Sequence, residues 1–153
     1  MSERRTRKSE ASERVREARA LCEARGARLT PQRTQVLELL AEAGKPVSAY
    51  ELMDMLSARL AKRVAPPTIY RALEFLVSHG LVSHLGAHNT YVVCAYPRER
   101  HDCVFFCCEG CGEVVEVADA EIERLLAKDA ARLGFDLAHS TLEVQGLCQN
   151  CQG

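Results

Sequence analysis

The chain has 153 residues, 47% of them hydrophobic and 27% charged, which excludes a disordered chain and allows one domain or two small ones. The net charge is -1, but the two halves of the chain differ in charge. Residues 1–93 contain 15 Lys and Arg and 10 Asp and Glu, whereas residues 94–153 contain 5 Lys and Arg and 11 Asp and Glu. The basic half is the one suited to bind a polyanion. No segment approaches the roughly 20 apolar residues of a membrane-spanning helix, so we expect no membrane partner.

The amino-terminal region begins with a polar segment and continues into helices. Residues 1–13 are charged and nearly without apolar side chains, which predicts a mobile arm. A helix is expected to follow, to about Arg25, before Gly26. Thr30 can cap a second helix, which runs to about Ala43, with Pro31 in its first turn.

Two more helices and a hairpin complete this half. A capping-box pattern at Ser48 opens a third helix, to about Leu60. A fourth helix is expected from Pro66 to His79, since its apolar residues recur at helical spacing. Apolar segments on both sides of a turn-like stretch at 86–89 predict a two-stranded hairpin. Helices followed by such a wing predict a winged helix-turn-helix domain over residues 14–93.

A hinge over residues 94–100 is expected to lead to a second domain over residues 101–153. This domain is predicted to contain, in chain order, a strand over 103–107, a strand over 113–117, a helix capped by Asp119, and a strand within 135–144. A unit of this size buries little core alone, so metal binding and dimerisation are expected to stabilise it. The predicted fold class is α+β, with an N-terminal winged-helix domain and a small C-terminal α/β dimerisation domain.

Two Cys-x-x-Cys pairs lie in this second domain, Cys108 with Cys111 and Cys148 with Cys151, separated by 36 residues. Two intervening residues let both thiolates of a pair bind the same ion, so the four predict a tetrahedral structural zinc. Disulfides are the alternative, but the first thirty residues contain no secretory signal, which indicates a reducing, cytoplasmic location. A zinc with four protein ligands has no open position, so we expect no enzyme.

A second, looser set of zinc donors surrounds the hinge. A site that takes ligands from the wing, the hinge and the second domain would fix the angle between the two halves, and so could act as a switch. Each donor taken singly is also consistent with a solvated surface residue or, for cysteine, with packing. The donors are His79, His84, His88, Cys94, His101, Cys103 and Glu116.

Several segments of the chain resemble, in order, signatures of the ferric uptake regulator family, and most closely its zinc uptake regulator branch. The resemblance covers nearly the whole chain, from about Ala18 to Cys151. The matching segments are Arg28-Leu29-Thr30-Pro31-Gln32-Arg33, Ser48-Ala49-Tyr50, Pro66-Pro67-Thr68-Ile69-Tyr70-Arg71-Ala72-Leu73, Cys108-x-x-Cys111-Gly112 and Gly146-Leu147-Cys148-x-x-Cys151.

The resemblance implies a homodimeric winged-helix repressor with a structural zinc on four cysteines and a regulatory zinc on His, Cys, His and Glu. The last three regulatory positions correspond to Cys94, His101 and Glu116. The first corresponds to Ser83, which leaves two candidates for the fourth ligand. His84 is adjacent, although a shift of one residue in a strand reverses the direction of the side chain. Cys103 is the other candidate, and its thiolate favours zinc over iron or manganese.

The fourth helix is the candidate for binding in the major groove of DNA. Arg71 is suited to bidentate hydrogen bonds with guanine, and the resemblance implies base contacts for Arg71 and Tyr50. Packing beneath the helix is the alternative for Tyr70, and an ion pair with Glu74 is the alternative for Arg71. The candidate DNA-binding residues are Tyr50, Thr68, Tyr70 and Arg71, with Arg28 and Arg33 expected at phosphates.

We therefore expect a zinc-dependent transcriptional repressor of zinc-uptake genes, with two zinc ions per chain, that binds palindromic double-stranded DNA as a homodimer. One alternative is an iron- or peroxide-responsive regulator of the same family, which needs a hinge site richer in His and Asp. An alternative of another class is a thiol-based zinc-storage or redox protein. The basic half and the helix that contains Arg71 argue against it.

Overall fold

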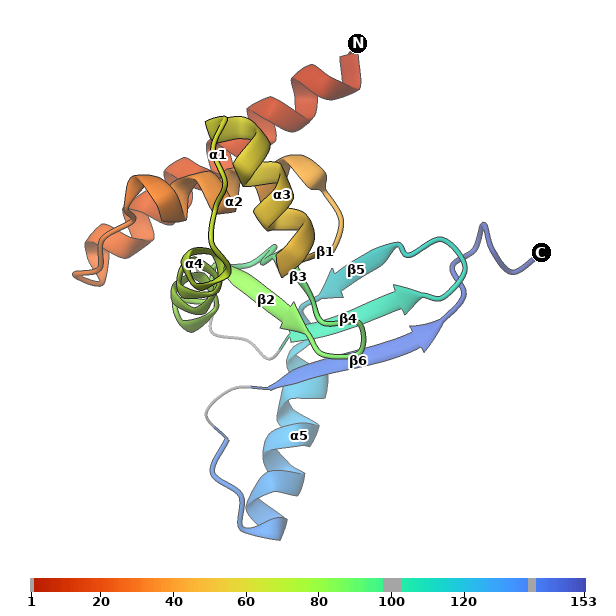
Figure 1. Ribbon diagram of the computed structural model, residues 1–153. Coiled ribbons are helices and arrows are strands. Elements are labelled where there is room, and N and C mark those ends of the chain that lie inside the picture. The colour runs from red at the N-terminus through yellow and green to blue at the C-terminus, as the bar shows by residue number, and fades with distance from the viewer. Residues whose placement is uncertain (1, 98–102, 138–139) are drawn as a thin grey trace. The chain divides into compact units, whose positions relative to one another are not determined.

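The computed structural model describes residues 2–97, 103–137 and 140–153, in two compact units, Met1–Pro97 and Arg98–Gly153. The first unit contains, in chain order, α1 (Ser2–Ala24), α2 (Pro31–Ala43), β1 (Val47–Ser48), α3 (Ala49–Leu60), α4 (Pro66–Ser78), β2 (Val82–Leu85) and β3 (Thr90–Val93) (Figure 1). The second contains β4 (Cys103–Cys108), β5 (Val114–Val117), α5 (Ala120–Leu133) and β6 (Thr141–Gly146). None of the helices in these described ranges is long and apolar enough to cross a bilayer.

Helix α1 begins at Ser2, so most of the segment that the sequence predicted as a mobile arm, residues 1–13, is helical. The segment contains neither Gly nor Pro and is rich in strong helix formers. Glu10 and Arg14 are also spaced one helical turn apart, which favours the helix. One face of α1 is buried as far toward the amino terminus as Ala11; its buried residues are Ala11, Val15, Ala18 and Cys22.

The predicted caps of the next helices are confirmed. The side chain of Thr30 accepts a hydrogen bond from the Arg33 backbone N–H at the start of α2, and Gly44 ends this helix in the left-handed conformation. The core of the first unit then forms between α2, α3, α4 and α1. Its fully buried leucine and isoleucine side chains are Leu37, Leu40, Leu52, Leu56, Ile69, Leu73 and Leu76.

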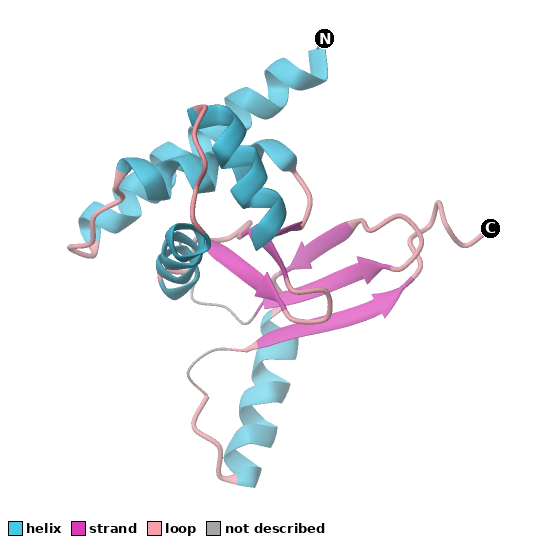
Figure 2. Ribbon diagram, viewed as in Figure 1, coloured by secondary structure: helices cyan, strands magenta, loops and turns pink. Residues whose placement is uncertain are grey.

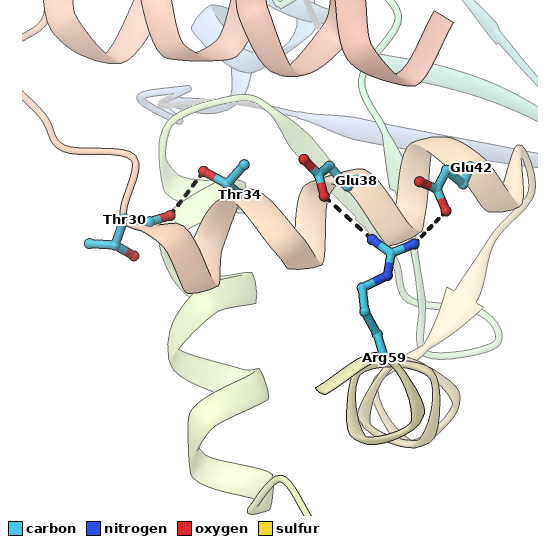
Figure 3. A network of polar contacts seen from close by, with 5 residues as sticks. All are labelled: Thr30, Thr34, Glu38, Glu42 and Arg59. Atoms are coloured by element: carbon cyan, nitrogen blue, oxygen red, sulfur yellow. Dashed lines mark hydrogen bonds and ion pairs between the residues drawn. The ribbon is translucent and has the colours of Figure 1, made fainter. Parts of the chain in front are cut away.

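A polar network joins α2 to α3 beside this core (Figure 3). The Arg59 guanidinium lies between two carboxylates of α2, with Nη1 3.4 Å from Glu38 Oε2 and Nη2 2.6 Å from Glu42 Oε2. These groups are about one-third exposed, so each pair is expected to contribute only about 0.2–1 kcal/mol. The network therefore orients α3 against α2 more than it stabilises the fold.

The start of α3 provides a stability prediction. Ser48 Oγ accepts a hydrogen bond from the Glu51 N–H at 3.2 Å, while Glu51 Oε2 accepts one from the Ser48 N–H at 2.8 Å. Ser48→Ala removes an acceptor of α3's first turn and is expected to cost about 1 kcal/mol of unfolding free energy. Urea unfolding followed by far-ultraviolet circular dichroism measures this cost. Ser12→Ala, at an exposed position on α1, is the control and is expected to change stability by less than about 0.5 kcal/mol.

The same capping box makes α3 sensitive to acid. The hydrogen bond from the Ser48 backbone N–H holds the pKa of Glu51 below its usual value, with a smaller effect from the Ser48 side chain. Because the folded-state pKa is the lower one, this stabilisation is present above the unfolded-state pKa of about 4.3 and is lost as pH falls through the folded-state value.

The wing has three strands rather than the two that the hairpin predicted, in the order β1-β3-β2. The additional strand, β1, is only two residues long and pairs Val47 with Tyr91 and Ser48 with Thr90. A strand this short carries no periodic pattern that the sequence could reveal. Its pairing joins the N-terminus of α3, and thus Tyr50, to the wing.

The second unit is a three-stranded sheet in the order β5-β4-β6 (Figure 2). β4 is antiparallel to β5 and parallel to β6, with α5 in the crossover. Among the described residues of this unit, only Val104, Phe105 and Cys108 have buried side chains, and α5 buries none. The α+β fold class is confirmed, and the small core indicates that this unit needs stabilisation from elsewhere.

Candidate metal centres and nucleic-acid interface

The parallel pairing of β4 and β6 brings the two cysteine pairs together. The two strands end side by side, with Cys108 opposite Gly146. The Glu109 N–H donates to the Gly146 carbonyl at 2.8 Å just beyond this point. Each Cys-x-x-Cys turn therefore begins at the same end of the sheet, although the pairs are far apart in sequence.

The sulfur positions fit a tetrahedral zinc. The four Sγ atoms of Cys108, Cys111, Cys148 and Cys151 all lie within 4.8 Å of one another, and Cys111 Sγ is 3.8 Å from Cys148 Sγ. Four sulfurs at a Zn–S distance of about 2.3 Å in a tetrahedron lie about 3.8 Å apart. All eight cysteines lie among the described residues, and none of them forms a disulfide.

Backbone geometry at the turns holds the sulfurs close. Gly112 has a left-handed φ of 77° and its N–H donates to the Cys108 carbonyl at 3.0 Å. A Cβ at Gly110 would lie 3.0 Å from Cys151 Sγ, a tighter contact than most Cβ atoms make, so a side chain here would displace the Cys151 sulfur. Sequence analysis missed Gly110, although a glycine between the two cysteines of a pair is itself a signal for a close backbone approach.

Hydrogen bonds within the cluster give its thiols different pKa values. The backbone N–H of Cys148, at 3.3 Å from Cys108 Sγ, and that of Cys111 lower the pKa of Cys108 to about 6. The neighbouring sulfurs, first that of Cys148, raise the pKa of Cys151 to about 12. Without a cation the four sulfurs cannot all ionise easily, so this cluster requires a positive ion to hold four thiolates.

A second pair of zinc donors lies elsewhere in the second unit. Cys103 is the first residue of β4, and Glu116 on β5 pairs with Phe105, two residues further along β4. Residues two apart in a strand share a face, so Cys103 and Glu116 point to the same side of the sheet. Cys103 Sγ and a Glu116 carboxylate oxygen lie within 4.8 Å of each other.

In the first unit, Ser83 and His84 on β2 differ in burial, which bears on whether His84 is the fourth regulatory ligand. Ser83 is buried, whereas the adjacent His84 is exposed on the other face of β2. His84 Nε2 is 2.7 Å from Asn89 Oδ1, and its ring lies 4.7 Å from that of Tyr91, so His84 contacts the hairpin itself. His84 therefore points away from the face of Ser83, as adjacent residues of a strand do.

Cys94 follows β3 directly and is 4% exposed. Its carbonyl accepts a hydrogen bond from Arg14 Nη1 at 3.2 Å, a contact that sequence analysis did not anticipate. No sequence signal marks it, because a guanidinium that binds a backbone carbonyl needs no particular residue there. His101, a predicted ligand, lies outside the described residues.

The candidate DNA-contacting side chains lie on the surface of the first unit. Arg71 is exposed on α4, next to Tyr70, which is 43% exposed, and Thr68, which is half-buried. Within the described part of the chain, no ion pair joins Arg71 to Glu74. Tyr50, in the first turn of α3, is 67% exposed, so its ring is free to contact DNA.

The two arginines expected at phosphates differ in their surroundings. Arg28 is exposed. Arg33 lies with its guanidinium carbon 3.6 Å from the centroid of the Phe75 ring, and its Nη1 donates to the Arg28 carbonyl at 2.7 Å. Arg33 therefore connects α2 to α4, and Arg28 is the better candidate for a phosphate contact.

These features define a class of protein: a winged-helix domain followed by a small α+β domain that contains a four-cysteine metal centre. The pattern of the ferric uptake regulator family matches residues 24–145, and the chain belongs to this family.

Individual relatives are similar over nearly the whole chain. A zinc uptake regulation protein of Escherichia coli is 37% identical over 145 residues, 94% of this chain and 84% of that protein. One from Mycobacterium tuberculosis is 35% identical over 130 residues, 84% of this chain and 98% of that protein. A solved structure of a zinc uptake regulator complexed with zinc and DNA is 37% identical, with a TM-score of 0.85 over 92% of this chain and 93% of that chain.

Proposed function

We propose that the protein is a zinc-responsive transcriptional repressor that binds the operators of zinc-uptake genes. The observation that carries the proposal is a second pair of zinc donors, Cys103 and Glu116, outside the four-cysteine centre. A closed centre supports folding and cannot report zinc scarcity without unfolding, so a regulator needs another site. The named relatives and the complex with zinc and DNA support the same function.

The regulatory ligands that we propose are Cys94, His101, Cys103 and Glu116. Cys103 takes the fourth position in place of His84, because it lies on the same face as Glu116, whereas His84 is engaged with Asn89 and Tyr91. Two thiolates among four ligands favour zinc over iron or manganese, which prefer harder donors. With the four-cysteine centre, each chain then holds two zinc ions.

The proposed ligands come from both units of the chain. Holding them on one ion restricts how the units move relative to each other, so zinc occupancy and DNA affinity become coupled. Such coupling is reciprocal, and operator DNA should therefore tighten regulatory zinc binding by the same factor.

Operator binding requires two copies of α4 if the site is palindromic, and we propose that the protein acts as a homodimer in the cytoplasm. The second unit exposes large apolar side chains that a partner copy would cover: Phe106, Val115, Leu125, Leu133, Phe135 and Leu147. Thiol ligands also require a reducing compartment.

The test is DNA binding by protein that holds one zinc per chain and is then titrated with zinc, iron or manganese. We expect zinc to increase operator affinity about 5- to 150-fold, the usual range of allosteric coupling, and iron and manganese to act weakly. An operator affinity that does not respond to the second zinc would refute the switch.

The same titration identifies the fourth ligand. Cys103→Ser is expected to abolish the zinc response, because it removes a thiolate beside Glu116, whereas His84→Ala should retain it. The reverse pattern would assign the position to His84. Both variants should keep the first zinc, which equilibrium dialysis can verify.

A further inference from the structure

We propose that Arg14 is a positioning residue for the regulatory zinc site: its guanidinium fixes the backbone at Cys94 and thereby the direction of the Cys94 thiol. This inference rests on the proposed function, since it concerns the same ligand set. Arg14 lies on α1, 80 positions from Cys94 in sequence, yet its Nη1 is 3.2 Å from the Cys94 carbonyl oxygen.

Cys94 needs such support because it lies just beyond the last residue of β3. Its N–H donates to the Leu81 carbonyl at 3.0 Å, and its carbonyl accepts from Arg14. These two contacts hold both sides of the Cα atom from which the thiol extends. Losing one of them leaves the peptide plane after Cys94 more freedom to rotate.

The surroundings of Arg14 keep the guanidinium in place. Arg14, Cys94 and Pro97, together with apolar residues of α1, α2 and the wing, line a small pocket of ≈ 10 Å³, about the space of one water molecule. Arg14 is half-buried, and the hydrogen bond to Cys94 is partly shielded from solvent. Shielding strengthens such a bond between a charged donor and a carbonyl.

A second arginine, just after α1, contacts the same segment. Arg25 lies 11 residues after Arg14, directly after the last residue of α1. Its Nη1 donates to the His79 carbonyl at 2.6 Å, and its Nη2 is 3.5 Å from the Pro97 carbonyl. Arg14 on α1 and Arg25 in the turn after it thus contact the two ends of the segment 94–97. Because Arg25 also contacts the end of α4, its substitution would have two effects, so Arg14 is the better residue to test.

Contacts that orient a metal ligand typically change metal affinity by about 10- to 100-fold when they are removed. The Arg14 contact orients the ligand through its backbone, so we expect an effect at the lower end of this range. DNA affinity at saturating zinc should not change, because the inference gives Arg14 no role in contacting DNA.

The experiment uses the full-length protein with the four-cysteine centre loaded, as wild type, Arg14→Gln, Arg14→Lys and Arg16→Gln. Arg16 is exposed on the same helix, so Arg16→Gln matches the loss of charge without the contact. Regulatory zinc affinity is measured by chelator competition, and operator affinity is measured over the same zinc range. Arg14→Gln is expected to raise the zinc concentration at half-maximal DNA binding about tenfold, Arg14→Lys less, and Arg16→Gln not at all.

Three results would overturn the inference. The zinc midpoint of Arg14→Gln could equal that of Arg16→Gln. Operator affinity could fall at saturating zinc together with its salt dependence, which would make Arg14 a phosphate contact. The midpoint could also shift only in step with a lower melting temperature in both Arg14 variants, which would indicate a structural role alone.

The same measurements separate this inference from the proposed function. A wild-type protein whose DNA binding ignores zinc overturns the function and the inference together. If the wild type responds to zinc and Arg14→Gln has the same zinc concentration at half-maximal DNA binding, only the inference is overturned. Cobalt substitution adds a direct readout, since a displaced Cys94 thiolate should weaken the thiolate-to-cobalt absorption of the regulatory site in Arg14→Gln at a fixed cobalt concentration.

Discussion

Cys148→Ser is expected to remove zinc from the four-cysteine centre and, with it, the folded state of the second unit. The described part of this unit buries only Val104, Phe105 and Cys108, and no side chain of α5 is buried. So small a core leaves little stability without a metal, whereas structural zinc sites bind with about 10–16 kcal/mol at neutral pH. The expected loss is therefore large enough to unfold the unit.

The measurement is zinc content per chain, together with circular dichroism and the oligomeric state in solution. Wild type should hold two zinc ions, and Cys148→Ser should lose the tighter one and its dimers. Cys107→Ser provides the matched control, because Cys107 lies on β4 beside Cys108 but outside the cluster. Burial raises the pKa of the Cys107 thiol, so it is a neutral group whose replacement should spare the metal. If Cys148→Ser kept its zinc and its melting temperature, the structural role of the centre would be wrong.

The four-cysteine centre was largely predictable because the spacing within each pair determines what two thiolates can reach. The sequence did not specify how the pairs would meet. That depends on the parallel register of β4 and β6, which places Cys108 opposite Gly146 across a long crossover. Strand pairing between distant segments depends on tertiary packing, so local patterns do not reveal it.

The elements of the first unit show where local signals suffice. Thr30 and Ser48 mark helix starts through hydrogen bonds that each residue forms within three positions, and both starts were predicted correctly. The helical structure of residues 2–13 was not predicted, because low hydrophobicity indicated a mobile arm, whereas helix-forming side chains and the burial of Ala11 favour a helix. The amino-acid composition of a segment does not reveal that one small residue in it is buried by tertiary packing.

The proposed regulatory ligands also combine what local pattern predicts with what only strand pairing reveals. Strand alternation predicted that His84 would face away from the position of Ser83, and the structure places them on opposite faces. The choice of Cys103 needed the register of β4 against β5, which sets Cys103 on the face of Glu116. Resemblance named three ligands, and sheet geometry supports a fourth that differs from the family's histidine.

Arg71→Ala is expected to weaken operator binding about 10- to 100-fold for each half-site, because one bidentate contact with guanine is worth about 1–3 kcal/mol of discrimination. Arg71 is exposed on α4, and within the described residues no ion pair to Glu74 competes for it. The loss should be confined to operators that keep the contacted guanine, so base substitution at one position of each half-site should cost the variant little. Arg71→Lys should restore part of the affinity but not the discrimination, since an ammonium lacks the planar pair of donors.

Arg28→Gln supplies the comparison that separates base contacts from phosphate contacts. Arg28 is exposed, and loss of a phosphate contact should weaken all DNA sequences alike and reduce the salt slope of log K by about 0.9 for each copy of Arg28 in the dimer. Fluorescence anisotropy with wild-type and single-substitution operators, at several salt concentrations and saturating zinc, distinguishes the two patterns. If Arg71→Ala also weakened every sequence equally and lowered the salt slope, α4 would hold the DNA backbone, and sequence discrimination would have to come from another residue, of which Tyr50 is the most exposed candidate.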